Sequence, residues 1–196
     1  MIPYPNTNLA SERGFDPRVL GSFTAQLYLR KALNQVHQML YDPSKSQQTP
    51  LPQVPRVDGN FNIVTYIEQA LDKSFVPLEF KFDQDDPPAT DILAARLRAK
   101  YYGALVITFR PFIRQVVQFN LHRTTLHSPA PISGDFRSEL TVPVIGPEAT
   151  TENDIDPLII EYAKKGIQAL IQSTKAFHGL GPQRFIITNV FGTAHA

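Results

Sequence analysis

Apolar residues recur at helical spacing in separate stretches of this chain. In the stretch 19–41, the residues that share one helical face are Leu29, Leu33, Val36 and Leu40. In the stretch 60–76, a similar stripe consists of Val64, Ile67, Leu71 and Phe75, and Asn60 is placed to cap its start. Repeats at i, i+3 or i+4, and i+7 indicate amphipathic helices. We therefore expect helices over 19–41 and 60–76.

Start signals predict two further helices. The pair Thr90-Asp91 supplies an N-cap with an acid in the first turn for a helix that becomes apolar nearly all round from Tyr101 onward. Pro111 removes a backbone donor within this stretch, so we expect a kink or a new helix there. Asp156 followed by a proline opens the last of these helices, and Gly179 is the expected C-cap. The predicted fold class is all-α, an irregular helical domain.

Proline-rich and polar segments divide the chain. We expect a flexible tail over 1–18 and a single helical domain over 19–196, interrupted by long loops at 42–58 and 123–156. The final apolar stretch, 184–196, has no stop signal after it. We therefore expect the domain to be incomplete at its C-terminus.

Composition excludes several classes of function. The 196 residues carry a formal net charge of only +1 and contain no cysteine. A near-neutral chain has no global field that would recruit nucleic acid or a membrane. Without cysteine there is no disulfide, thiol catalysis or thiolate zinc site. No apolar run approaches the ~20 residues of a membrane-spanning helix.

No motif in the sequence predicts catalysis or metal binding. Phosphate-binding glycine loops and hydrolase nucleophile motifs do not occur. His122 and His127 are five positions apart, which is not the ligand spacing of a helix. A group of acids lacks the calcium-loop spacing and is interpreted as a solvated loop: Glu79, Asp83, Asp85, Asp86 and Asp91. We expect no enzyme activity, cofactor or metal in this chain.

Charge is distributed unevenly along the chain. Between Ile92 and Gly134 there is no acidic residue, whereas basic residues are frequent. Such a stretch is open to two interpretations, a face for nucleic acid or an acidic partner, or a stretch balanced by the acidic loop before it. We favour the second, because the nearby aromatic residues lie on the apolar side: Tyr101, Tyr102, Phe109 and Phe112.

The sequence Arg110-Pro111-Phe112 is unusual at the expected end of a buried helix. An arginine there needs a carbonyl or carboxylate partner, because an unpaired buried charge is very costly. Free carbonyl groups at a helix C-terminus would accept hydrogen bonds from this arginine. We favour this structural role for Arg110 over contact with an anionic ligand.

Three blocks of sequence resemble the regulatory domain of fungal zinc binuclear-cluster transcription factors. They are the run from Leu27 to Tyr41, the run from Ala95 to Ile113 with its tyrosine pair and its arginine-proline-phenylalanine turn, and the segments 173–178 and 188–195. The resemblance implies an all-helical regulatory domain of a nuclear transcription regulator. In this family zinc belongs to a cysteine-cluster module that reads DNA, and this chain has no such cluster.

On this resemblance, we expect the helical regulatory portion of a fungal-type transcription regulator, either a fragment or a relative without its DNA-binding module. Its expected partners are other transcription machinery or an N-terminal DNA-binding module, with no membrane and no strong direct binding of nucleic acid. The alternative is a stand-alone module that binds a protein or a small-molecule effector. The candidate effector or structural residues are Tyr101, Tyr102, Arg110, Pro111 and Phe112.

Overall fold

The computed structural model describes residues 13–40, 68, 71–72, 76–124, 143–146 and 148–185. Of these residues, 72% are helical, in three helices, and no strand occurs among them. The expected all-α class is therefore confirmed for this part of the chain. Three expected elements fall largely or wholly outside it: the helix at 60–76, the loop at 42–58 and the stretch after residue 185.

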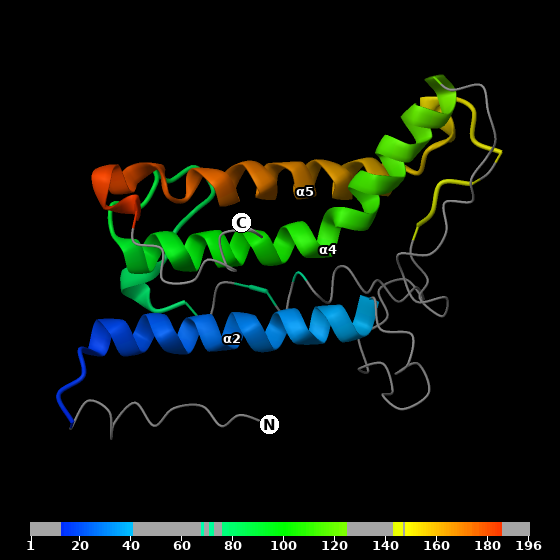
Figure 1. The fold of residues 1–196 in the computed structure, drawn as a ribbon. Coiled ribbons are helices and arrows are strands. Elements are labelled where there is room, and N and C mark those ends of the chain that lie inside the picture. The colour runs from blue at the N-terminus through cyan, green and yellow to red at the C-terminus, as the bar shows by residue number, and fades with distance from the viewer. Residues whose placement is uncertain are drawn as a thin grey trace. The chain divides into compact units, whose positions relative to one another are not determined.

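Three long α-helices organise the described residues (Figure 1). They are α2 (Pro17–Leu40), α4 (Ile92–Thr124) and α5 (Pro157–Lys175). Short 3-10 helices lie between or after them: η3 (Leu78–Phe80), η4 (Glu152–Asp154) and η5 (His178–Phe185). None of the described helices is both long and apolar enough to cross a membrane.

The chain divides into two compact units. Unit 1 contains residues 1–33, 71–104 and 169–196, and unit 2 contains residues 34–70 and 105–168. Each long helix contributes one part to each unit.

Unit 1 buries one face of α2 against α4 and the segment before it. Leu29, predicted from the apolar stripe, is fully buried, as are Leu71 and Leu97. A smaller cluster surrounds Ala89, Ala95 and Leu180, and Phe177 packs against it. The spacing of apolar residues in 19–41 therefore identified a face that is buried.

Unit 2 is built around aromatic side chains of α4 and α5. Phe109 and Phe112 are almost completely buried, and both rings contact the ring of Tyr162, with centroid distances of 5.7 Å and 4.9 Å. The two helices approach closely at Gly166, where a Cβ atom would lie 2.8 Å from the Cβ of Phe109. Glycine at this position permits the close packing.

The predicted helix starts are confirmed at two positions. The backbone N–H of Ala94 donates to the Asp91 carboxylate over 2.9 Å, and the N–H of Leu158 donates to the Asp156 carboxylate over 2.8 Å. Each aspartate therefore satisfies a backbone donor that the first helical turn leaves without a helical acceptor.

Of the two alternatives expected at Pro111, the new helix is wrong and the bend is present (Figure 1); the expected end of the last helix at Gly179 is wrong. No new helix starts at Pro111, because α4 continues through it to Thr124, although Figure 1 shows α4 bending in its second half. Interior prolines bend helices in this way. Helix α5 ends at Lys175, and Gly179 is not its C-cap. Positive φ, at 54°, occurs instead at Gly181.

Part of the expected loop 123–156 is ordered by side-chain hydrogen bonds. The Gln115 side chain accepts from the backbone N–H of Ile145 over 3.0 Å and thereby joins this segment to α4. Farther along, the Asp154 carboxylate accepts from the backbone N–H groups of Thr150 and Thr151 over 2.9 Å and 2.8 Å. The segment 143–156 is therefore not structureless where the structure describes it.

Candidate functional site

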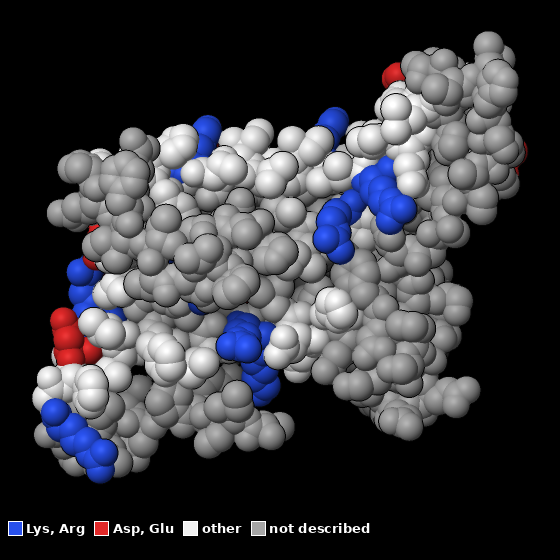
Figure 2. Space-filling model, in the orientation of Figure 1, with Lys and Arg blue, Asp and Glu red and all other residues white. Residues whose placement is uncertain are grey.

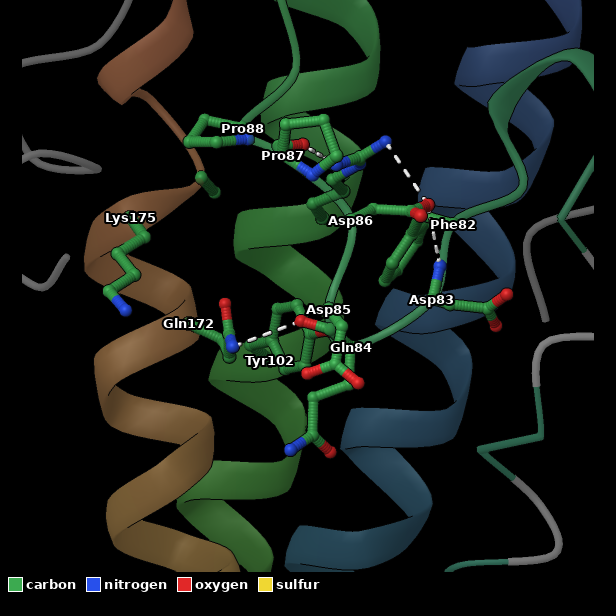
Figure 3. A pocket seen from close by; sticks show the side chains of 12 residues that line it. Phe82, Asp83, Gln84, Asp85, Asp86, Pro87, Pro88, Tyr102, Gln172 and Lys175 are labelled. Atoms are coloured by element: carbon green, nitrogen blue, oxygen red, sulfur yellow. Dashed lines mark hydrogen bonds and ion pairs between the residues drawn. The ribbon is translucent and has the colours of Figure 1, made fainter.

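Unit 1 contains a pocket of about 320 Å³ between the loop 82–88 and the helices α4 and α5 (Figure 3). Its lining combines acidic, basic, aromatic and amide side chains. The residues that line it are Phe82, Asp83, Gln84, Asp85, Asp86, Pro87, Pro88, Arg98, Tyr102, Gln172, Lys175 and Ala176. Every one of them belongs to unit 1.

The loop 82–88, which covers the pocket, is held by contacts with both α4 and α5. On the α4 side, Arg98 Nη1 donates to the Pro87 carbonyl over 2.7 Å, and Arg98 Nη2 lies 4.0 Å from the Asp86 carboxylate. On the α5 side, Gln172 Nε2 donates to the Gln84 carbonyl over 3.0 Å. The loop is therefore held in place by both helices.

Arg98 is the most enclosed charged side chain of the pocket, with only 16% of its side chain exposed. Its guanidinium group lies over the ring of Phe82, 5.1 Å from the centroid, a cation–π geometry. Its Nε atom is buried and has no hydrogen-bond partner among the described residues. Buried polar atoms normally have such a partner, so the contacts with Phe82 and Pro87 hold this guanidinium group with one N–H left unsatisfied.

Tyr102 forms the aromatic floor of the pocket together with Phe82. The two rings lie 5.7 Å apart between centroids, and the ring of Tyr101 lies edge-on to Tyr102 at 5.3 Å. Burial raises the pKa of the Tyr102 hydroxyl, and the nearby carboxylates of the 83–86 loop add to this effect, whereas Arg98 opposes it. The hydroxyl is therefore a neutral donor surrounded by charges of both signs.

The pocket has an exposed side formed by residues from different elements. Asp85 projects from the loop and Lys175 from the last turn of α5, with Gln172 and Tyr102 between them (Figure 3). Both Asp85 and Lys175 are exposed. The carboxylate and the ammonium group therefore stand on different sides of one shared space.

The structure separates the residues that the sequence grouped as one candidate site. Tyr101 and Tyr102 belong to unit 1, whereas Arg110, Pro111 and Phe112 belong to unit 2. Of these five residues, only Tyr102 lines the pocket. Phe112 and Pro111 are buried in the core of unit 2.

Arg110 does not occupy the position that the sequence predicted. It lies in the middle of α4, not at its end, and its side chain is exposed. The expectation of a buried arginine paired with terminal carbonyls is therefore wrong. The helix turns Arg110 outward while Phe109 and Phe112 face the core, because residues one and two positions away point in other directions.

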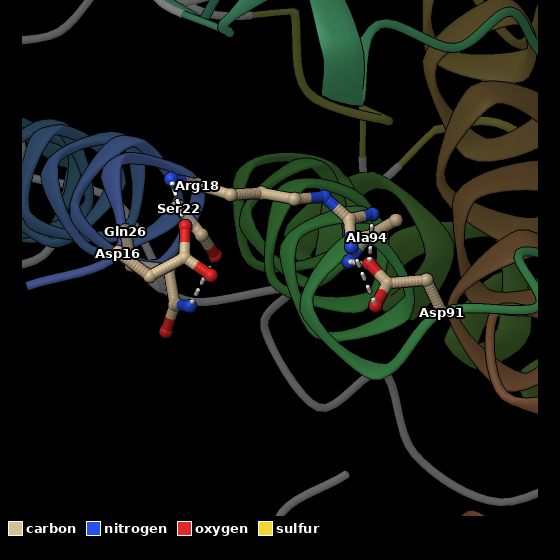
Figure 4. Close-up of polar contacts among 6 residues, drawn as sticks. All are labelled: Asp16, Arg18, Ser22, Gln26, Asp91 and Ala94. Carbon is tan, nitrogen blue, oxygen red and sulfur yellow. Dashed lines mark hydrogen bonds and ion pairs between the residues drawn. The ribbon is translucent and has the colours of Figure 1, made fainter.

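Acidic residues before α4 do pair with basic residues of unit 1. Asp86 approaches Arg98, and Asp91 forms a 3.0 Å ion pair with Arg18 on α2 (Figure 4). At the end of this unit where α2 and α4 begin, Figure 2 shows acidic and basic side chains next to each other. For Arg98, the interpretation that the acidic loop balances the basic stretch is confirmed.

Lys100 belongs to a more basic part of the same unit. Its ammonium group donates to the Gln26 side chain over 2.7 Å and links α4 to α2. Burial, followed by the charges of Arg96 and Arg30, lowers the pKa of Lys100. Three cations therefore lie close enough together to disfavour one another's charge.

Lys165 in unit 2 is surrounded by acidic side chains, whereas Lys100 lies near basic ones. Its ammonium group lies 3.0 Å from the carboxylate of Glu68 and 3.1 Å from that of Glu161. Burial works against the charged form, but the hydrogen bonds and charges of the two carboxylates outweigh it and raise the pKa of Lys165. These contacts hold Glu68 against α5.

No metal centre is found in the part of the chain that the structure describes, where no three acidic or histidine side chains come together as a ligand group. His37 and His178 are exposed, and the side chains of His122 and His127 lie outside the described residues. The acidic loop is tied to Arg98 and to its own backbone: the Asp83 N–H donates to the Asp86 carboxylate over 2.8 Å.

Sequence reasoning missed the contribution of α5 to the pocket. Gln172 and Lys175 are three positions apart, so they share one helix face, which also carries Ala176. Arg98 and Tyr102 have the equivalent i, i+4 relationship on α4. This spacing was visible in the sequence, but nothing local shows that the two faces and the loop meet.

Comparison with known proteins gives no family for this chain. No family model, curated protein or solved structure matches it.

Proposed function

We propose that this chain is the helical regulatory portion of a fungal-type transcription regulator. It acts in the nucleus through protein partners, without catalysis, and leaves DNA contact and zinc to a separate cysteine-cluster module. The observation that supports the proposal is the position of the residues that carry the resemblance. The tyrosine pair and the arginine-proline-phenylalanine turn lie on one continuous helix, and Tyr102, Phe109 and Phe112 are all buried.

Burial of these residues indicates that the aromatic side chains of the motif serve the packing of the core. Exposed aromatic side chains at these positions would have favoured a base-stacking surface for nucleic acid. In the core, they stabilise the helical packing that a regulatory domain needs in order to present its surface to partners. The proposal therefore predicts that transcriptional output depends on the folded helices and not on direct DNA contact.

A tethering experiment tests the proposal. The chain is fused to an unrelated DNA-binding domain in a fungal host, and the output of a reporter gene is measured. The fusion is expected to change reporter output several-fold relative to the DNA-binding domain alone. The variant Phe112→Ala, which opens the core of unit 2, is expected to abolish the change. Val117→Ala, on the exposed side of the same helix, serves as its matched control.

Two results would contradict the proposal. One is reporter output identical for the fusion and the DNA-binding domain alone, at equal protein level. The other is tight, salt-resistant and sequence-specific binding of the purified chain to DNA in a gel-shift assay. Weak binding that disappears with added salt is expected, because the formal net charge of the chain is only +1 and few phosphate contacts would be made.

The second candidate function is an effector-binding module. The mixed-charge pocket of unit 1 favours it, since it combines an aromatic floor with polar groups from separate elements. A thermal-shift screen of the purified chain against small metabolites tests this function. Stabilisation by one metabolite that is lost in Lys175→Gln would support it, and an unchanged melting temperature with every metabolite would count against it.

A further inference from the structure

Within unit 1, α2 and α4 run side by side in the same direction (Figure 1). Two side-chain contacts define which turns of the two helices face each other: Arg18 pairs with Asp91, and Lys100 donates to Gln26. The contacting residues are 73 positions apart in the first pair and 74 in the second. Facing turns therefore advance together along the two helices, and the facing turn can be named for each residue of this stretch.

Three cations gather along this contact. Arg96 and Lys100 are one turn apart on α4, and Arg30 is one turn beyond Gln26 on α2, so the three form a row. The charges of Arg96 and Arg30 act on the ammonium group of Lys100 and contribute to its lowered pKa. The hydrogen-bond acceptor of Lys100 is a neutral amide, which does not balance its charge. Figure 2 shows basic side chains over the middle of α2, away from the acidic ones near its start.

Exposed apolar side chains precede this row on the same side of α2. Val19 and Phe23 are one turn apart, with 46% and 50% of their surface exposed. Positions 19, 23, 26 and 30 are separated by three or four residues, so they share one side of the helix. Gln26 belongs to this series and contacts Lys100, so this side borders the cations of α4. Together these side chains form one surface of unit 1, the α2–α4 surface: Val19, Phe23, Arg30, Arg96 and Lys100.

Apolar side chains beside a row of cations complement an amphipathic helix that carries acids. Carboxylates at positions i, i+4 and i+8 of a helix follow one another at about 6 Å, the same spacing as cations on successive turns of α2 or α4. Apolar side chains of such a helix would cover Val19 and Phe23 and remove them from water. Pairing of opposite charges would determine the partner and its orientation.

We propose that the α2–α4 surface binds an acidic amphipathic helix of a partner protein, with its carboxylates along the row of cations and its apolar side chains on Val19 and Phe23. This inference names the chemistry of the protein partner in the proposed function and rests on that function. It divides the basic residues of α4 between two roles. Arg98 is balanced by Asp86 within the chain, whereas Lys100 belongs to a binding surface.

Nucleic acid fits this surface less well. The α2–α4 surface offers three cations, and the affinity for nucleic acid depends on the number of phosphate contacts. Single strands also need a series of aromatic rings on which successive bases stack. Phe23 is the one aromatic residue of the surface, and Val19 beside it cannot stack on a base. The observations therefore favour a protein partner.

Fluorescence anisotropy with two labelled peptides tests the inference. The probe is a peptide of about 18 residues, long enough to form a helix, with leucine along one side and glutamate at i, i+4 and i+8 beside it. The comparison peptide has glutamine in place of each glutamate. The glutamate peptide is expected to bind the purified chain with a Kd of about 10–100 μM, about tenfold or more tighter than the glutamine peptide. Absence of saturable binding up to ~1 mM would overturn the inference, and so would equal affinity for the two peptides.

Two variants locate the binding surface. Arg30→Gln removes a charge partner and Phe23→Ala an apolar contact, and each is expected to weaken binding about fivefold or more. The matched controls are Lys164→Gln, an exposed cation of α5, and Leu78→Ala, an apolar side chain that is 82% exposed. Both controls are expected to leave affinity unchanged. All four side chains are exposed, so circular dichroism is expected to be the same for every variant. Binding that neither Arg30→Gln nor Phe23→Ala weakens more than the controls would contradict the inference.

Competition by duplex DNA and the reporter assay separate the remaining outcomes. Displacement of the probe by duplex DNA at lower concentration than by unlabelled peptide, at ~0.15 M salt, would overturn the inference in favour of a nucleic-acid surface. Absence of peptide binding with intact reporter output would remove the α2–α4 surface and leave the regulator proposal in place. Peptide binding without any reporter effect would do the reverse.

Discussion

The Cα atom of Gly179 lies so close to the backbone of Ala89 that a Cβ atom on residue 179 would be 2.6 Å from the Ala89 carbonyl oxygen. The Pro88 carbonyl oxygen would be 2.7 Å away. Neither contact can be relieved by rotating a side chain. Gly179→Ala is therefore expected to lower the free energy of unfolding by about 1–3 kcal/mol. A urea titration measures this change, and an unaltered midpoint would show that the approach is looser than described.

Gly103→Ala is expected to have the opposite effect. Gly103 lies inside α4, and a Cβ atom there would meet no atom within 4 Å. Alanine in a helix interior is favoured over glycine by about 0.5–1 kcal/mol, because it restricts the unfolded chain and suits the helix. The same titration should give a higher midpoint. A lower midpoint would show that the added methyl group clashes with a neighbouring atom.

Asp91 has two roles that substitution can separate. Its carboxylate caps α4 through Ala94 and pairs with Arg18, whose side chain is 48% exposed. Asp91→Asn keeps an oxygen for the cap and loses only the exposed ion pair, about 0–1 kcal/mol. Asp91→Ala also removes the cap, which costs about 1 kcal/mol more. Equal melting temperatures for the two variants would contradict a capping role.

Gln115 is expected to control the stability of the segment around Ile145. In Gln115→Ala the buried N–H of Ile145 loses its acceptor, a loss of about 1–3 kcal/mol when a buried donor is left unsatisfied. Amide hydrogen exchange at Ile145 should become faster. Asn120→Ala, on an exposed position of the same helix, is the control and should leave this exchange rate unchanged.

The contribution of Asp154 to stability should depend on pH. Hydrogen bonds from the backbone of Thr151, and then from Thr150, lower the pKa of this carboxyl below its usual 3.8. A carboxylate with a lowered pKa stabilises the fold above its unfolded value, and this stabilisation is lost as pH falls through the folded value. Asp154→Ala should therefore melt below the wild type at neutral pH, and the difference should close below pH 3.8. A difference that does not vary with pH would contradict this assignment.

Local signals in the sequence were sufficient for the helix starts. Asp91 and Asp156 each act on a backbone N–H two or three positions away, so their role is contained in a few residues. The stripe through Leu29 and Val36 likewise identified a buried face of α2, because helical periodicity alone determines which residues share a face.

Features that depend on distant residues could not be predicted in this way. Gly179 follows the end of α5 by a few residues, which predicts a helix cap, but the reason for a glycine there lies in the backbone of Pro88 and Ala89. The pocket is a similar case. Arg98 and Gln172 hold the same loop from different helices, and no pattern within either helix reveals the other.

The prediction for Arg110 was wrong for a different reason. The proline after it indicates the end of a buried helix, which would place the arginine among terminal carbonyls. Helix α4 instead continues past Pro111, so Arg110 is one more outward residue of a helix whose core face is formed by Phe109 and Phe112. Continuity of a helix through proline depends on tertiary packing, which the local sequence does not contain.

The contrasting surroundings of Lys100 and Lys165 give the chain two amines of different nucleophilicity. Burial and the charges of Arg96 and Arg30 favour the neutral, reactive amine at Lys100, whereas Glu68 and Glu161 keep Lys165 protonated. An acylating reagent at limiting concentration is therefore expected to modify Lys100 before Lys165. The reaction at Lys100 takes place when the hydrogen bond between Lys100 and Gln26 opens. Acylation at Lys100 would remove one of the contacts between α4 and α2, so a charge-neutralising modification of one side chain would weaken the packing of unit 1.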